Sequence, residues 1–158
     1  MKYALLACLA SACLLTGGHA LAQDASPPAA APGCPATASD MPLAALFGTW
    51  EARFEGLPGV AKVQLAKHPD YAGVRGTITR GGGDAPSSVA QLAGDVDEDG
   101  YLSLDESMDG RSISGVWLGE LQAASCGREF KGVWRNAADE STRPFVLTKI
   151  NDNTGKRR

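Results

Sequence analysis

Residues 95–106 have the residue types and spacing of a calcium-binding loop. The segment DVDEDGYLSLDE matches the ligand positions of an EF-hand loop, with glycine at the position of the sharp turn. Ca²⁺ prefers carboxylate and carbonyl oxygens. The expected ligands are Asp95, Asp97, Asp99, the Tyr101 carbonyl, Ser103 directly or through water, and a bidentate Glu106. One function that the sequence allows is therefore calcium binding in the cell envelope, with an affinity of about 0.1–1 mM.

The flanking residues favour a second interpretation of the same loop. An EF-hand needs a helix on each side, whereas the following residues 107–110, SMDG, cannot start a stable helix. The pair Asp99-Gly100 is common in tight turns, and acids along the exposed side of a β-hairpin would produce the same pattern. The calcium loop and the acidic hairpin therefore stay open as alternatives.

Other residues that could perform chemistry are few. His68 is the only histidine after residue 22, in the turn-like segment KHPD, so the usual zinc sets and Cys–His pairs are not available. No G-x-S-x-G elbow supports a Ser-His-Asp triad. Aspartates and glutamates are plentiful, which leaves a hydrolase with a carboxylate pair as a second alternative. We expect a protein that is not an enzyme, with no cofactor apart from the calcium discussed above.

The first 22 residues have the three parts of a secretory signal peptide. Lys2 supplies the positive start, an apolar run extends from Tyr3 to Leu15, and residues 20–22, ALA, fit a cleavage site. The run is too short for a permanent membrane span, and no second such segment follows. Cys8 stands too early in the apolar run for lipid attachment, and Cys13, which is better placed, follows a weaker lipid-attachment box. We expect a periplasmic or secreted protein that is cleaved after Ala22 and carries no lipid.

Two cysteines remain after cleavage, Cys34 and Cys126. In an oxidising compartment the simplest interpretation is one disulfide, which would close a loop of about 90 residues and add about 4 kcal/mol of stability. The Ala/Pro-rich residues 23–40 are expected to be a linker, disordered apart from the anchor at Cys34, and residues 151–158 a disordered tail. The folded domain is then residues 41–150.

The elements that would position any site are strands. Apolar and polar residues alternate with a period of two in most segments of the domain, as in residues 50–55, WEARFE. Turn signals rich in Gly, Pro, Asp and Asn separate these segments. The segments expected to be strands are 50–55, 61–65, 74–80, 89–94, 102–105, 113–121, 130–135 and 145–148. Strands of this number and spacing predict an all-β fold, a small antiparallel eight-stranded up-and-down barrel or, alternatively, a β-sandwich.

A glycine-x-tryptophan triplet occurs three times, ending at Trp50, Trp117 and Trp134. Glycine and tryptophan two apart point to the same face of a strand, so the glycine leaves room for a neighbouring indole. The first triplet, at the start of the first strand, resembles that of the calycins, the lipocalin and avidin group of eight-stranded barrels. The resemblance implies a barrel whose mouth holds a ligand, with the three tryptophans as candidate ligand contacts.

The charge of the chain and its pattern limit the classes of partner that it could bind. The net charge is −3 and no basic stripe with interleaved aromatic residues occurs, which disfavours nucleic-acid binding. The preferred hypothesis is an exported, monomeric β-barrel module of the bacterial envelope, which holds a small hydrophobic ligand or docks a protein partner.

Overall fold

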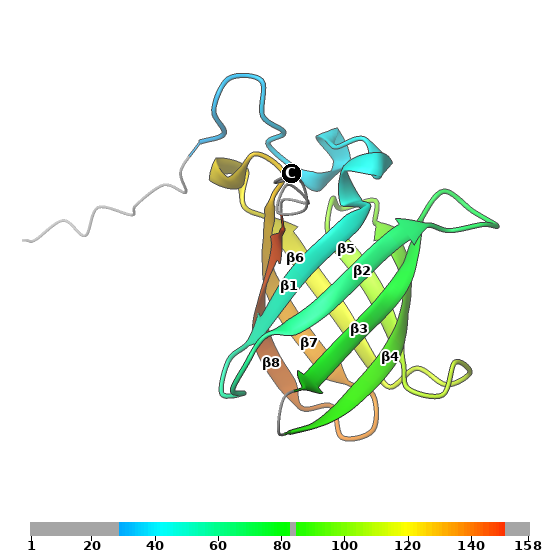
Figure 1. Ribbon diagram of the computed structural model, residues 1–158. Helices are drawn as coiled ribbons and strands as arrows, with labels where there is room; N and C mark the ends of the chain where they lie inside the picture. Colours follow the sequence, from blue (N-terminus) through cyan, green and yellow to red (C-terminus); the bar gives the residue numbers. More distant parts are fainter. Residues whose placement is uncertain (1–28, 83–84, 151–158) are drawn as a thin grey trace, which may run out of the picture.

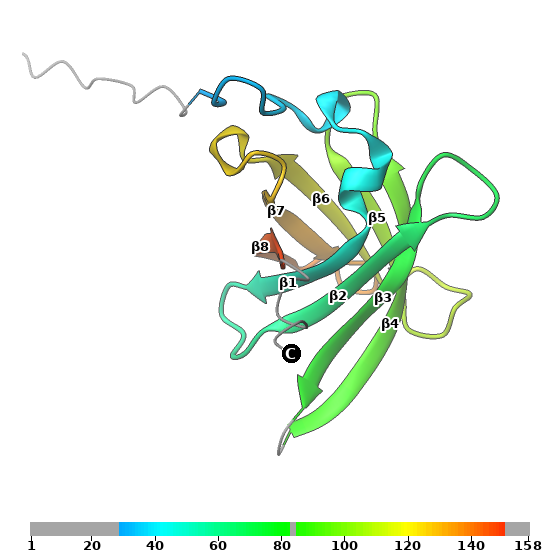
Figure 2. The same ribbon diagram turned by 45° about the horizontal axis from the view of Figure 1, so that its top comes forward.

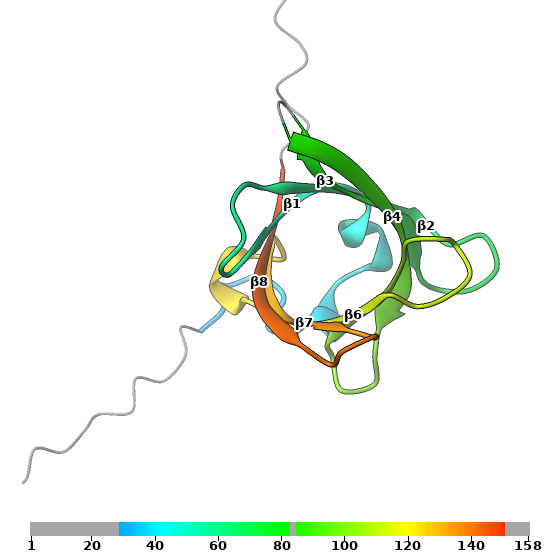
Figure 3. The same ribbon diagram turned by 90° about the horizontal axis from the view of Figure 1, so that it is seen from below.

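The computed structural model describes residues 29–82 and 85–150. In this part of the chain, eight antiparallel strands close into one barrel, in which each strand pairs with its sequence neighbours and the last pairs with the first (Figures 1 and 3). The strands are β1 (Gly48–Phe54), β2 (Ala61–Lys67), β3 (Val74–Gly82), β4 (Ala85–Val96), β5 (Leu102–Ser107), β6 (Gly115–Leu121), β7 (Glu129–Asn136) and β8 (Thr142–Lys149). The predicted eight-stranded up-and-down barrel is confirmed, and the β-sandwich alternative is wrong.

The period of two decides which side chains fill the barrel. In β5, Leu102 and Leu104 are buried, whereas Ser103 is half-buried and Asp105 is exposed. Every strand contributes in the same way to one interior core. Its larger members are Trp50, Val63, Ile78, Leu92, Leu104, Trp117, Phe130 and Leu147. Closing the sheet on itself also leaves no unpaired strand edge.

One end of the barrel, which we call the closed end, is covered by the residues that precede β1. Two short 3-10 helices, η1 (Ala38–Asp40) and η2 (Leu43–Leu46), lie across it (Figure 2). Leu46 is fully buried, and its carbonyl accepts the indole N–H of Trp50 at 2.8 Å. The ammonium group of Lys149 donates to the carbonyl of Ala45. The chain therefore caps this end of its own barrel.

The disulfide between Cys34 and Cys126 ties the same segment to the connection between β6 and β7, which contains η3 (Ala123–Ser125). The predicted pairing is thus present. The structure differs from the predicted domain boundary at residue 41, because Ala38 is already 1% exposed and belongs to the core. Packing against the barrel end and the covalent link together order residues that their Ala/Pro-rich composition assigns to a linker.

The opposite end, which we call the open end, carries the hairpin loops 55–60, 108–114 and 137–141. Within the described ranges no helix lies over it (Figure 3). Residues 29–82 and 85–150 also contain no helix that is long and apolar enough to cross a membrane. The expected signal peptide and the expected C-terminal tail lie outside the described residues.

Candidate functional site

The open end of the barrel contains a pocket of about 610 Å³. Phe54 and Trp134 line it from the strands, and Met108 and Ile113 line it from the loop between β5 and β6. Met108 and Ile113 are 54% and 51% exposed, and Leu57 in the loop between β1 and β2 is 43% exposed. Large apolar side chains therefore gather around an opening into the barrel, which is the usual character of a small-molecule site.

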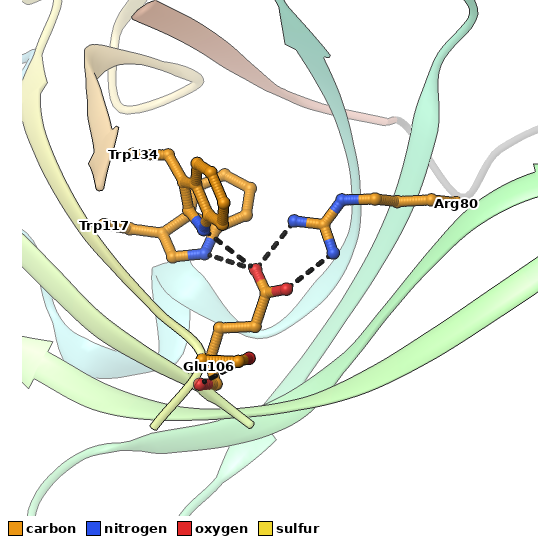
Figure 4. A network of polar contacts seen from close by, with 5 residues as sticks. Arg80, Glu106, Trp117 and Trp134 are labelled. Atoms are coloured by element: carbon orange, nitrogen blue, oxygen red, sulfur yellow. Dashed lines mark hydrogen bonds and ion pairs between the residues drawn. The ribbon is translucent and has the colours of Figure 1, made fainter. Parts of the chain in front are cut away.

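A buried carboxylate forms the polar floor of this pocket. Glu106 is 2% exposed and is the one buried charged residue in the described part of the chain. Arg80 binds it with both terminal nitrogens, at 2.6 Å to Oε1 and 2.7 Å to Oε2. The indole N–H groups of Trp117 and Trp134 donate to Oε2 at 3.0 and 3.2 Å (Figure 4). Four hydrogen bonds from three strands thus converge on one carboxylate.

These contacts explain how a charge is kept inside an apolar barrel. A buried carboxylate is costly unless a cation and hydrogen bonds compensate it. The bidentate pairing between a guanidinium and a carboxylate is the strongest such arrangement, and the two indoles occupy the remaining acceptor capacity of Oε2. The result is a floor with no net charge whose members hold one another in place.

Aromatic rings complete the walls around Arg80. Its guanidinium carbon lies 5.2 Å from the ring centroid of Phe54 and 5.9 Å from that of Trp134. Gly115 makes room for this packing, because a Cβ atom there would lie 2.3 Å from Nε1 of Trp134. The prediction that the glycine of a triplet accommodates a neighbouring indole is therefore confirmed at Gly115. Arg80 is held by rings on its faces and by Glu106 at its tip.

A second cation, Arg143, also lines the pocket. It lies opposite Trp134 in the pairing of β7 with β8. Because it is two residues from the buried Phe145, its side chain is on the inner face of the strand. Hydrogen bonds from Ser141 lower the pKa of Asp139 most, and the charge of Arg143 lowers it further. Because Glu106 already compensates Arg80, Arg143 gives the pocket lining a positive charge toward the mouth.

The loop that carries Met108 and Ile113 is ordered by an exposed carboxylate. Oδ1 of Asp109 accepts the backbone N–H groups of Ser112 and Arg111, each at 2.8 Å. These hydrogen bonds favour the charged form and lower the pKa of Asp109 to about 2. These bonds give the loop that carries Met108 and Ile113 a defined turn.

The structure separates the three tryptophans that the calycin resemblance groups as ligand contacts. Trp134 lines the pocket. Trp117 is 1% exposed and does not line the pocket, but its indole N–H donates a hydrogen bond to Glu106 in the pocket floor. Trp50 lies at the closed end, donates to Leu46 and is not in the lining. Of the three tryptophans, Trp134 is thus the one that lines the pocket.

The six expected calcium ligands do not converge in the structure. Asp95 and Ser103 face each other across β4 and β5, and the intervening turn is a hairpin in which Asp97 accepts the backbone N–H of Tyr101 at 2.8 Å. Glu106 points into the barrel toward Arg80. Asp99 stays in the turn with Gly100, whose φ is +84°.

The acidic hairpin is therefore the arrangement that the chain adopts between β4 and β5. Over the described residues no group of three or more His, Cys, Asp or Glu side chains could hold a metal ion. Gly100 lies in the turn, as the calcium interpretation expects. Glu106, which would supply the bidentate contact of an EF-hand, binds Arg80 inside the barrel instead.

Sequence reasoning missed Arg80 and Arg143 and gave Glu106 a different role. A signal was present: each of the three falls on the inward phase of its strand, two residues from a buried Ile78, Phe145 or Leu104. A charged residue on an otherwise apolar phase needs a partner inside the barrel. Opposite charges on the inward phases of two strands are the pattern that could have revealed the pair.

No family model, no curated protein and no solved structure matches the chain. The calycin resemblance is therefore supported at the level of the closed eight-stranded antiparallel barrel, and the site has to be interpreted from its own geometry.

Proposed function

We propose that this protein is a binding module that holds a small, mainly apolar molecule in the open end of its barrel. The observation that carries the proposal is the 610 Å³ pocket with Phe54, Trp134, Met108 and Ile113 in its lining. A pocket of this size with few, converging polar groups suits a small organic ligand. The disulfide supports a site of action in an oxidising compartment such as the periplasm.

The polar groups limit how such a ligand would lie. Nη1 and Nη2 of Arg80 are engaged with Glu106, so Arg80 offers its remaining N–H groups and no net charge. Arg143 stands nearer the mouth. We expect the apolar body of the ligand to contact Phe54 and Trp134, with a polar group within reach of the two arginines.

The test uses the disulfide-intact protein without its leader and the neutral fluorescent probe N-phenyl-1-naphthylamine. We expect saturable binding with a blue-shifted emission. The dissociation constant should be on the order of 1–10 µM, which corresponds to the binding free energy that one apolar pocket can supply. Energy transfer from Trp134, which lines the pocket, should accompany it.

Matched variants on β4 locate the binding. Ser88 lines the pocket, whereas the next residue, Val89, is 54% exposed on the outside. Ser88→Trp should fill the pocket and weaken binding at least about tenfold, and Val89→Trp should leave it unchanged. Absence of saturable binding, or equal weakening by both variants, would contradict the proposal.

Docking of a protein partner at the same end is a second candidate. It is favoured by the exposed apolar side chains of Leu57, Met108 and Ile113 on two separate loops. If Met108→Ser and Ile113→Ser abolish a pull-down partner from envelope extract while the probe still binds the wild-type pocket, the rim serves a protein and the pocket is secondary.

A further inference from the structure

A second depression lies on the outside of the barrel, over β2, β3, β4 and β5, and its volume is about 700 Å³. It does not share lining residues with the pocket at the open end. The side chains that point into it alternate along the strands with the buried Leu65 and Leu92. It is therefore a groove on the outer face of the sheet, separated from the first pocket by the barrel wall.

Polar side chains cross this groove in register. One row runs over the four strands as Gln64, Thr77, Gln91 and Ser107, each directly opposite the next. Because neighbouring strands are about 4.8 Å apart, the row spans about 14 Å. That length accommodates several linked sugar rings and exceeds the size of one monosaccharide.

The adjacent row alternates small and charged residues: Ala66, Arg75, Ala93 and Asp105. Ala93 leaves a low floor between Arg75 and Asp105, which form no ion pair with each other. Arg75, Thr77 and Gln91 also make no side-chain hydrogen bond within residues 29–82 and 85–150. Donors and acceptors that the fold does not use are thus exposed along the groove.

An aromatic pair borders one end of the groove. The ring of His68, which lines it, stacks on Tyr71 with centroids 3.9 Å apart and planes inclined by 33°. Tyr71 is 43% exposed. Burial raises the pKa of Tyr71 most, and the charges of Asp95 and Asp105 raise it further. The C–H face of a sugar ring packs well on such an exposed aromatic surface.

The chemistry of the groove selects among ligand classes. Arg75 and Asp105 cancel in charge, so neither a polyanion nor a polycation is favoured. The lining lacks the large exposed apolar side chains found at the open end. An extended peptide could not add to the sheet either, because a closed barrel presents no edge. Planar amide and charged groups that hydrogen-bond to hydroxyls, next to an aromatic surface, fit a carbohydrate.

We propose that the outer groove over β2–β5 binds a neutral oligosaccharide, with Gln91 and Asp105 bonding its hydroxyl groups and the His68–Tyr71 pair contacting a sugar face. This binding is independent of the ligand at the open end.

The test is a titration of the ¹⁵N-labelled, disulfide-intact protein with three neutral tetrasaccharides, cellotetraose, maltotetraose and chitotetraose, to about 10 mM, which covers the weak affinities typical of such exposed sites. At least one should give saturable amide shifts confined to β2–β5 and to the loop that carries His68 and Tyr71. Gln91→Ala and Asp105→Ala should each weaken that binding about fivefold, as for the loss of one net hydrogen bond.

Val133→Ala, at an exposed position of β7, is the matched control and should leave the affinity unchanged. Three results would overturn the proposal: no saturable shift with any of the three sugars, shifts at the open end instead of β2–β5, or tighter binding of the acidic tetragalacturonate than of every neutral sugar. Each is distinguishable from failure of the naphthylamine probe, which reports on the other pocket.

Discussion

The two ends of the barrel are built from the same eight strands and differ in what covers them. At the closed end, η2 inserts Leu46, which is fully buried, and backbone carbonyls satisfy Trp50 and Lys149. At the open end, apolar loop residues such as Met108 and Ile113 stay about half exposed over a pocket. Apolar side chains are therefore buried at the closed end, where they stabilise the fold, and remain exposed to solvent at the open end.

The two ends also treat charge differently. Lys149 at the closed end lies 5.2 Å from the ring centroid of Trp50 and bonds a neutral carbonyl. The open end contains Arg80 and Glu106, whose charges compensate each other, and Arg143 nearer the mouth. The proposed binding at this end needs polar groups that are positioned before the ligand arrives, and the hydrogen bonds among Glu106, Arg80 and the two indoles hold these groups in place.

The largest effect is expected from Glu106→Ala. The change leaves the guanidinium of Arg80 and two indole N–H groups without their acceptor, so the free energy of unfolding should fall by about 3–5 kcal/mol. In thermal denaturation the midpoint should drop by about 10 °C or more. Glu120→Ala, at an exposed position of β6, should change it little. A loss below about 1 kcal/mol for Glu106→Ala would show that the network does not hold the open end together.

Removing the disulfide should be the next largest effect. The double variant Cys34→Ser, Cys126→Ser frees a link across a sequence separation of 92, which is expected to cost about 2–4 kcal/mol in urea denaturation. Binding of the naphthylamine probe should keep its affinity, because the link lies at the other end. Loss of probe binding in the folded double variant would mean that the two ends are coupled.

A matched pair of truncations compares the ends directly. Leu46→Ala removes a fully buried side chain from the plug and should cost about 2–3 kcal/mol, while Ile113→Ala at the rim should cost less than about 0.5 kcal/mol. The effect on the naphthylamine probe should be reversed, with Ile113→Ala weakening it more. Equal stability losses in urea would contradict the assignment of a closed and an open end.

The smallest effect concerns the rim loop and pH. Hydrogen bonds from Ser112 and Arg111 lower the pKa of Asp109 from 3.8 to about 2. A depressed pKa in the folded state stabilises the loop above about pH 4, and this contribution is lost as the pH falls from about 4 to about 2. The ¹³C shift of the Asp109 carboxyl should titrate near pH 2, with the amides of Ser112 and Arg111 moving together. A midpoint close to 3.8 would show that the loop is not held by this carboxylate.

Much of the fold could be predicted because its signals are local. The alternation in WEARF, residues 50–54, and the turn at Asp99-Gly100 each act within a few residues, and they led to strands and hairpins that the structure contains. The calcium interpretation shows the limit of the same reasoning. The spacing of the calcium motif is present in the sequence, but Glu106 lies on β5 at a position whose side chain points into the barrel. The alternation of the strand decides this direction, whatever ligand motif the residue belongs to.

The sequence by itself determined the all-β class, the strand count and, once two cysteines remain, the disulfide. Only the tertiary structure decided which end is plugged and which side chains meet inside. Arg80 and Glu106 are 26 residues apart, on β3 and β5 with β4 between them. Their contact depends on register across three strands and on the curvature that turns the inward faces toward one another. These are properties of the closed barrel as a whole, because no local pattern specifies a distance across its interior.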